Sequence, residues 1–196
     1  MKELIFIGGY GQSTEMNREL VCELEKRGYS VESYTLAQFY KVKDKQAVLK
    51  DKTVATHSIG LWLITGKIKA TKLLSFNPPE ASGLFASFRQ VLFSENFPKE
   101  HSLARHTKEV MSNPIVHVKS WFALKKFSAT DRLIDIGSKS PATKITLYYS
   151  SGDRIARSSN HNFDKLKKND IKTIDIKGLH RSLHSDPDET LKRAGI

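Results

Sequence analysis

The chain has a single cysteine, no long apolar run and no zinc-type motif, and each absence excludes a class of protein. Cys22 stands alone, so an internal disulfide cannot form. The seven histidines include no His-Glu-x-x-His pair and no Cys/His ligand spacing, so we expect no metal and no cofactor. No apolar run approaches the roughly 20 residues that cross a bilayer. The apolar start is too short for a secretory signal and contains Glu3, so we expect a cytoplasmic protein that does not insert into membranes.

Negative charge is scarce relative to positive charge. Lysine and arginine number 32 against 21 aspartates and glutamates, which gives a net charge of +11 and a pI near 9.7. Such a field attracts anionic partners, namely nucleic acid, an acidic membrane surface or an acidic protein, although plain solubility is an equal explanation. No RNP motif and no helix-turn-helix is present, which argues against nucleic acid. We expect a monomer.

Short apolar segments alternate with helical patterns along the chain. Strands are predicted at "ELIFIGG" (3–9), "YSVESYTL" (29–36), "KTVATH" (52–57), "TKLLSFNPP" (71–79), "TKITLYYSSGD" (143–153) and "DIKTIDIKG" (170–178). Helices are predicted at 14–27, 37–50, 58–69, 157–168 and 185–195. In the first of these, Met16, Leu20 and Leu24 share one face, and Gly28 stands where a left-handed cap would end the helix. The alternation predicts an α/β fold, with a mainly parallel sheet of about six strands and helices on both faces.

Residues 80–140 break this alternation. They carry no clear strand but much helical, aromatic and basic character, as in "GLFASFRQVLF" and "KSWFALKKF". We therefore divide the chain into a core at 1–79 and 141–196 and a helical insertion at 80–140.

The residues that directly follow the predicted strands form a chemical set. They are Gly8-Gly9-Tyr10-Gly11, His57-Ser58-Ile59-Gly60, Gly152-Asp153 and Gly178-Leu179-His180. Ligands bind at the carboxyl ends of parallel strands, so these segments should meet at one edge of the sheet. A serine nucleophile, a histidine base and an orienting acid are the parts that acyl transfer requires. We assign these roles to Ser58, His180 and Asp153.

The oxyanion of the reaction needs fixed N–H donors, which we assign to the backbones of Tyr10 and Ile59. Each member of the set also has a simpler explanation. Ser58 could be a helix N-cap, and Asp153 could simply make a turn. Asp131 and Asp135 are rivals for the acid, and His184 is a rival for the histidine. His57 and Trp62 are read as packing or pocket residues.

In its order of serine, acid and histidine, and in the location of each after a strand, the chain resembles the α/β-hydrolase family. The resemblance covers the whole chain in element order, but only the four short segments are specific. Two departures stand out: Thr56 replaces the first glycine of the usual G-x-S-x-G turn, and Gly8 stands where many relatives have histidine. The chain also begins at the strand before the oxyanion turn, without the family's usual first two strands.

The insertion should form a lid over the site. Phe85, Phe88 and Leu92 fall on one helical face that could line an acyl pocket together with Trp62 and Trp121. Basic residues such as Arg89 and Arg105 would suit a substrate presented by an acidic carrier protein.

With "FIGGYG", "THSIGLW", "SGDRIARSS" and "HRSLHSDP", the chain resembles the pimeloyl-acyl-carrier-protein methyl ester esterases of biotin synthesis. The resemblance implies hydrolysis of a methyl ester on a carrier-bound pimeloyl chain, with Arg89 and Arg105 contacting the acyl carrier protein. The alternatives are a general small-ester esterase or thioesterase, and a non-catalytic anion-binding protein on a hydrolase fold.

Overall fold

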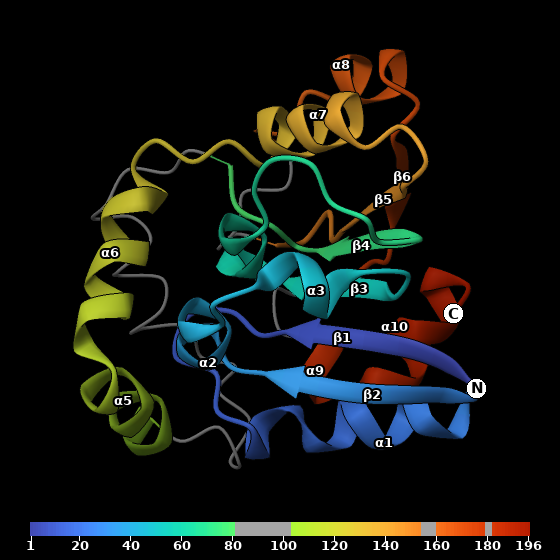
Figure 1. The fold of residues 1–196 in the computed structure, drawn as a ribbon. Helices are drawn as coiled ribbons and strands as arrows, with labels where there is room; N and C mark the ends of the chain where they lie inside the picture. Colours follow the sequence, from blue (N-terminus) through green and yellow to red (C-terminus); the bar gives the residue numbers. More distant parts are fainter. Residues whose placement is uncertain (81–102, 154–159, 179–181) are drawn as a thin grey trace.

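A six-stranded, wholly parallel sheet forms the centre of the molecule (Figure 1). The computed structural model describes residues 1–80, 103–153, 160–178 and 182–196. The strands are β1 (Lys2–Ile7), β2 (Tyr29–Tyr34), β3 (Thr53–His57), β4 (Lys72–Phe76), β5 (Lys144–Tyr149) and β6 (Lys172–Asp175), in the spatial order β2-β1-β3-β4-β5-β6. Five lie within the predicted segments and β1 begins one residue before its segment, which confirms the predicted fold class.

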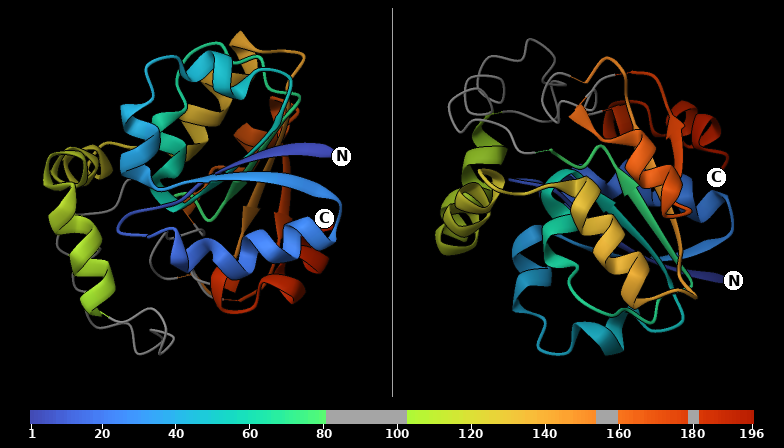
Figure 2. Two further views of the ribbon diagram at one scale, coloured as in Figure 1. Left: turned by 60° about the horizontal axis from the view of Figure 1, so that its bottom comes forward. Right: turned by 90° about the horizontal axis from the view of Figure 1, so that it is seen from above.

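Helices cover both faces of the sheet (Figures 1 and 2). They are η1 (Glu15–Asn17), α1 (Arg18–Lys26), α2 (Leu36–Lys41), α3 (Lys45–Leu49), η2 (Ser58–Leu63), α5 (Leu103–Ser112), α6 (Pro114–Leu124), α7 (Ala129–Lys139), α8 (Phe163–Lys168), α9 (Ser182–Ser185) and α10 (Pro187–Ala194). Alternate residues of each strand supply the two cores, because successive side chains point to opposite faces. Leu4 and Phe6 of β1 pack with α1, α9 and α10, whereas Ile5 and Ile7 pack with α2, η2 and α7.

The first helical segment has the predicted face. Met16, Leu20 and Leu24 are all buried, and Gly28 adopts the predicted left-handed conformation with φ of +84°. The segment begins as a 3₁₀ turn and continues as α1. The amphipathic spacing therefore placed this helix correctly against the sheet.

Two predicted helices differ from the observed ones. The segment 37–50 splits into α2 and α3, because Val42 takes an extended conformation and the side chain of Asp44 starts a new helix by accepting from the N–H of Ala47. The predicted helix 58–69 is instead the short 3₁₀ helix η2, which ends at Leu63. Beyond it the chain turns at Gly66 with φ of +68°.

The backbone after η2 forms hydrogen bonds with side chains of α7 and of its C-cap, where a longer helix would have formed hydrogen bonds within itself. Arg132 donates to the carbonyl of Ile64 at 2.9 Å, and the hydroxyl of Ser140 accepts from the N–H of Ile68 at 2.8 Å. The backbone groups of the buried residues Ile64 and Ile68 therefore have hydrogen-bond partners without helical structure.

The predicted insertion contains two kinds of helix in its described part. Helices α5 and α6 stand beyond the carboxyl ends of the strands, to one side of the sheet (Figures 1 and 2). Helix α7 instead lies on the sheet, where Leu133 and Ile136 are fully buried in the same core as Val54 and Leu73. Helix α7 is therefore part of the core rather than of a lid, and both the lid and the boundaries of the insertion stay predictions.

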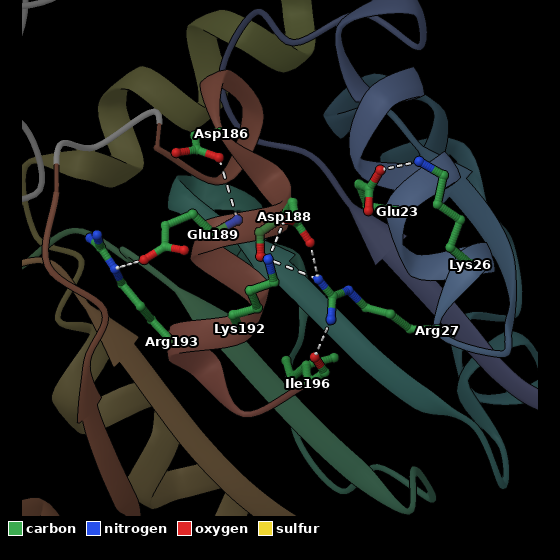
Figure 3. Close-up of polar contacts among 9 residues, drawn as sticks. All are labelled: Glu23, Lys26, Arg27, Asp186, Asp188, Glu189, Lys192, Arg193 and Ile196. Atoms are coloured by element: carbon green, nitrogen blue, oxygen red, sulfur yellow. Dashed lines mark hydrogen bonds and ion pairs between the residues drawn. The ribbon is translucent and has the colours of Figure 1, made fainter.

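The last helix is fixed to the first by one arginine (Figure 3). Arg27, at the end of α1, donates to the carboxylate of Asp188 at 2.6 Å and to the backbone carbonyl of Ile196 at 3.0 Å. Helix α10 begins with Pro187 after an Asp186 cap, and Gly195 ends it with φ of +71°. These contacts tie α10 and the C-terminal residue Ile196 to the end of α1.

Among the described residues no helix is both long enough and apolar enough to cross a membrane. Within the same residues, no group of three or more histidines, cysteines, aspartates or glutamates is placed to hold a metal ion.

Candidate active site

Ser58 stands on a sharp turn between β3 and η2. Its φ is +52°, a left-handed conformation that costs energy for any residue with a side chain. His57 before it is extended and η2 starts with Ser58 itself, so the chain reverses within one residue. The serine is part-exposed whereas its neighbours His57 and Ile59 are buried. A strained serine presented at the carboxyl end of a central strand is the geometry of a nucleophile elbow.

Two glycines let the backbone approach this turn. A Cβ on Gly60 would lie 2.7 Å from the carbonyl oxygen of Ile7 and 2.9 Å from that of Gly8. A Cβ on Gly9 would lie 2.9 Å from the Cβ of Ser58. Only glycine fits at both positions, so the turn after β1 and the turn after β3 are in direct contact. Tyr10 and Ile59, the predicted oxyanion donors, belong to these two turns.

Thr56, which replaces the usual first glycine, fits because of its neighbour on β4. Thr56 is fully buried and pairs in register with Ser75, and the two hydroxyls lie 3.1 Å apart. Because Ser75 is small, it leaves space for the side chain of Thr56, and its hydroxyl is a hydrogen-bond partner for that of Thr56.

Asp153 is buried in the turn that follows β5, where its N–H donates to the carbonyl of Ser150 at 2.9 Å. His180 lies outside the described residues, but Gly178, two positions before it, approaches the Asp153 turn. A Cβ on Gly152 would lie 2.8 Å from the carbonyl oxygen of Gly178. The turn that carries the predicted acid is therefore in contact with the end of the described segment after β6.

Asp175, at the end of β6, links the same two turns and was not singled out from the sequence. Its Oδ1 accepts from the N–H of Ser151 at 3.2 Å and from that of Lys177 at 2.9 Å. Burial alone would raise the pKa of Asp175, but these hydrogen bonds outweigh it and lower the pKa. An aspartate at a strand end gives no sequence signal that separates it from an ordinary turn residue.

The rivals for the catalytic acid occupy the surface. Asp131 pairs with Lys165 at 2.6 Å and Asp135 pairs with Lys139 at 2.6 Å, both on the outside of α7. His184, the rival histidine, is buried in α9. It contacts the ring of His57 edge to face, with the centroids 4.8 Å apart.

Tyr10, in the turn after β1, packs against side chains of helix α6. The ring of His117 contacts the ring of Tyr10 edge to face at 4.9 Å, and Trp121 lies 6.1 Å from Tyr10 at a tilted angle. His117 is 1% exposed, and neither of its ring nitrogens has a hydrogen-bond partner among the described residues. Burial lowers the pKa of His117 to about 4, so the ring is neutral at pH 7.

The predicted pocket residues and carrier-contact residues divide into three groups. Trp121 lies beside the site through Tyr10, as described above. Trp62 stacks instead on Tyr40 of α2, with the centroids 6.2 Å apart. Phe85, Phe88, Leu92 and Arg89 lie outside the described residues, as does the side chain of Arg105 in α5.

A second buried acid lies near the site and was not singled out from the sequence. Glu80, 7% exposed, faces His161 at 2.9 Å and accepts from the N–H of Thr130 at 2.7 Å. Burial alone would raise the pKa of Glu80, but the hydrogen bonds from His161 and Thr130 outweigh it and lower the pKa. This cluster joins the exit of β4 to α7 and to the segment before α8.

The comparison with solved structures identifies the fold. The N-formylmaleamic acid deformylase of Pseudomonas putida S16 superposes with a TM-score of 0.69 at 11% identity, covering 98% of this chain and 91% of that one. The chain has the α/β-hydrolase fold. A thioesterase domain from the curacin biosynthetic pathway gives a TM-score of 0.62 at 14% identity and covers 98% of this chain and 90% of that one.

BioG from Haemophilus influenzae superposes with a TM-score of 0.55 at 13% identity, and the match covers 91% of this chain and 88% of BioG. No protein-family model matches the sequence, and no curated protein matches it. At these identities the likeness establishes the fold, and the chemistry must be argued from the site.

Proposed function

We propose that the chain is a serine hydrolase that cleaves carboxylic esters with Ser58 as nucleophile. The observation that carries the proposal is the left-handed backbone of Ser58, held against Gly9 at the carboxyl end of β3. Strained residues of this kind cluster at functional sites. The thioesterase and esterase names among the structural neighbours support the same chemistry.

In the proposed reaction Ser58 attacks the ester carbonyl while His180 takes the hydroxyl proton. The negative charge that develops on the carbonyl oxygen is stabilised by the N–H groups of Tyr10 and Ile59. The alcohol leaves with the proton from His180, which forms an acyl-serine. Water then attacks the acyl-serine with His180 again as base, which releases the acid and restores Ser58. Asp153 orients the imidazole and stabilises its charged form.

We further propose that the substrate is the methyl ester of a pimeloyl chain on an acyl carrier protein. The sequence resemblance to esterases of this kind supports it, and so does the surface of the lid helices. Large apolar side chains are exposed there, with lysines among them: Met111, Ile115, Val118 and Phe122 beside Lys108, Lys119, Lys125 and Lys126. A basic surface with apolar contacts complements an acidic protein partner. Arg89 and Arg105 are the proposed additional contacts.

The first experiment is intact-mass measurement after treatment with a fluorophosphonate. Wild type should gain one adduct and Ser58→Ala none. The matched control is Ser151→Ala, which removes an exposed hydroxyl from the turn before Asp153 and should still gain the adduct. Absence of an adduct on wild type would refute the serine hydrolase, and binding of anions would then be measured instead.

The second experiment compares pimeloyl methyl ester free in solution with the same ester on acyl carrier protein. Arg105→Glu should lower kcat/KM for the carrier-bound ester by about tenfold and leave the free ester unchanged, because the lost attraction acts on the carrier. Lys168→Glu, on exposed α8, is the control for the same charge reversal away from the lid. Equal rates for both esters in all variants would favour a small-ester esterase.

A further inference from the structure

One buried glutamine contacts all three segments of the candidate site. Gln12, in the turn after β1, is 9% exposed. Its Nε2 lies 2.7 Å from Nδ1 of His57, the residue before the elbow serine, and 2.9 Å from Nε2 of His184 in α9. Its Oε1 accepts from the N–H of Gly9. Gln12 therefore lies between the oxyanion turn, the nucleophile turn and the segment that follows His180.

The hydrogen bond from Gly9 decides which way the amide of Gln12 faces. A backbone N–H can only donate, so the side-chain atom that faces Gly9 must be the carbonyl oxygen. The amide NH₂ group of Gln12 must then face the two imidazoles. That group has two hydrogens and no lone pair to offer, so it can only donate.

The two histidines must therefore accept. An imidazole nitrogen accepts only when it carries no proton, so Nδ1 of His57 and Nε2 of His184 are both unprotonated. Both rings are consequently neutral, with the proton of His57 on Nε2 and that of His184 on Nδ1. Nδ1 of His57 and Nε2 of His184 lie 3.4 Å apart but are not hydrogen-bonded to each other, because each already accepts one hydrogen of Gln12.

This arrangement holds the backbone that should bind the oxyanion. A Cβ on Gly9 would lie 2.9 Å from the Cβ of Ser58, so the two turns are closely apposed and a shift of the Gly9 peptide would displace the turn relative to the nucleophile. Tyr10, the proposed donor, is the next residue. A donor must lie within a few tenths of an ångström of its best position to stabilise the charge in full.

We propose that Gln12 is a positioning residue, which locks the oxyanion turn to the nucleophile elbow by donating to two neutral histidines. It acts through Gly9 and Tyr10 and does not contact the substrate. The proposal rests on the serine hydrolase proposed above and names the part of the chain that sets its oxyanion geometry.

The kinetic experiment uses Gln12→Met, which keeps the length of the side chain and removes its hydrogen bonds. We expect kcat for ester hydrolysis to fall by about 10- to 100-fold with KM changed by less than about threefold, because only the transition state loses a donor. The rate of fluorophosphonate labelling should fall by the same factor. The control is Gln38→Met, because Gln38 also accepts from a backbone N–H three residues away, that of Thr35, but in a part-exposed helix cap.

An unchanged kcat in Gln12→Met, or an equal fall in Gln38→Met, would overturn the positioning role. Absence of labelling in wild type would instead refute the hydrolase. The hydrogen-bond argument has an independent test in long-range ¹⁵N–¹H spectra of histidine-labelled wild type at pH 7.5. The signals are assigned with His57→Asn and His184→Gln. A proton on Nδ1 of His57 or on Nε2 of His184 would refute the arrangement without any activity measurement.

Discussion

Acid should weaken the attachment of helix α6, because His117 is buried there as a neutral ring. The pKa of this ring is lowered to about 4 in the folded protein, whereas in the unfolded chain it is near 6.5. As the pH falls through this window, His117 becomes protonated in the unfolded chain but stays unprotonated in the folded protein. Folding therefore loses stability between about pH 7 and pH 4, and is unaffected by His117 above that range.

The size of this loss follows from the difference in pKa. The full shift corresponds to about 3 kcal/mol, of which about 2 kcal/mol is lost at pH 5 relative to pH 8. His117→Phe keeps an aromatic edge against Tyr10 and removes the proton site. Urea unfolding of both proteins at pH 8 and pH 5 should show that wild type loses about 2 kcal/mol more than the variant. Equal losses would refute the assignment of a buried neutral ring.

The same transition can be observed locally. In a Trp62→Phe background Trp121 is the only tryptophan, and it lies against Tyr10 beside His117. Its fluorescence should change with a midpoint near pH 4, and addition of His117→Phe should remove that change. A change in far-UV circular dichroism at the same pH would show that the whole protein unfolds rather than α6 alone.

Three other perturbations test contacts described above. Glu80→Gln should destabilise the protein by about 1 to 3 kcal/mol at pH 7, since it replaces the buried carboxylate that faces His161 and accepts from Thr130, and by less as acid protonates Glu80 in wild type; equal urea midpoints at pH 7 would refute this. Gly60→Ala should lower the rate of fluorophosphonate labelling by more than about tenfold, because the new methyl group would push the elbow away from β1, and an unchanged rate would show that the turn can move freely. Arg27→Met should lower the melting temperature by several degrees in a thermal scan, because it removes the contact with Asp188 (Figure 3). The control is Lys26→Met, which removes only the exposed ion pair with Glu23 at the same helix end and should leave the melting temperature unchanged.

The sheet could be predicted from the sequence because its signal is local. Each strand is a short apolar segment bounded by glycine, proline or polar residues, and all six were found. The lengths of the helices could not be predicted in the same way. The segment after β3 has the apolar spacing of a longer helix, yet Arg132 and Ser140, about 70 positions later in the chain, satisfy its backbone in an irregular conformation. Such a contact leaves no trace in the local pattern.

The candidate site was predictable to the extent that it follows strand ends. Ser58 and Asp153 were selected because the carboxyl ends of parallel strands are where ligands bind; the structure places both at such ends, and their catalytic roles stay predictions. The contacts of Gln12, His117 and Glu80 were missed because each involves residues far away in the chain. The sequence assigns His57 to packing or to the pocket, and its Nδ1 lies 2.7 Å from Nε2 of Gln12.

The left-handed backbone at Ser58 also limits which nucleophiles this fold can accept. Threonine carries the same hydroxyl, but its branched Cβ is strongly disfavoured at positive φ, and the extra methyl group would have to be placed close to Gly9. Cysteine has an unbranched Cβ and fits the same turn. We therefore expect Ser58→Cys to keep the turn and Ser58→Thr to disrupt it. Among the two hydroxyl side chains, backbone geometry therefore selects serine over threonine at this position.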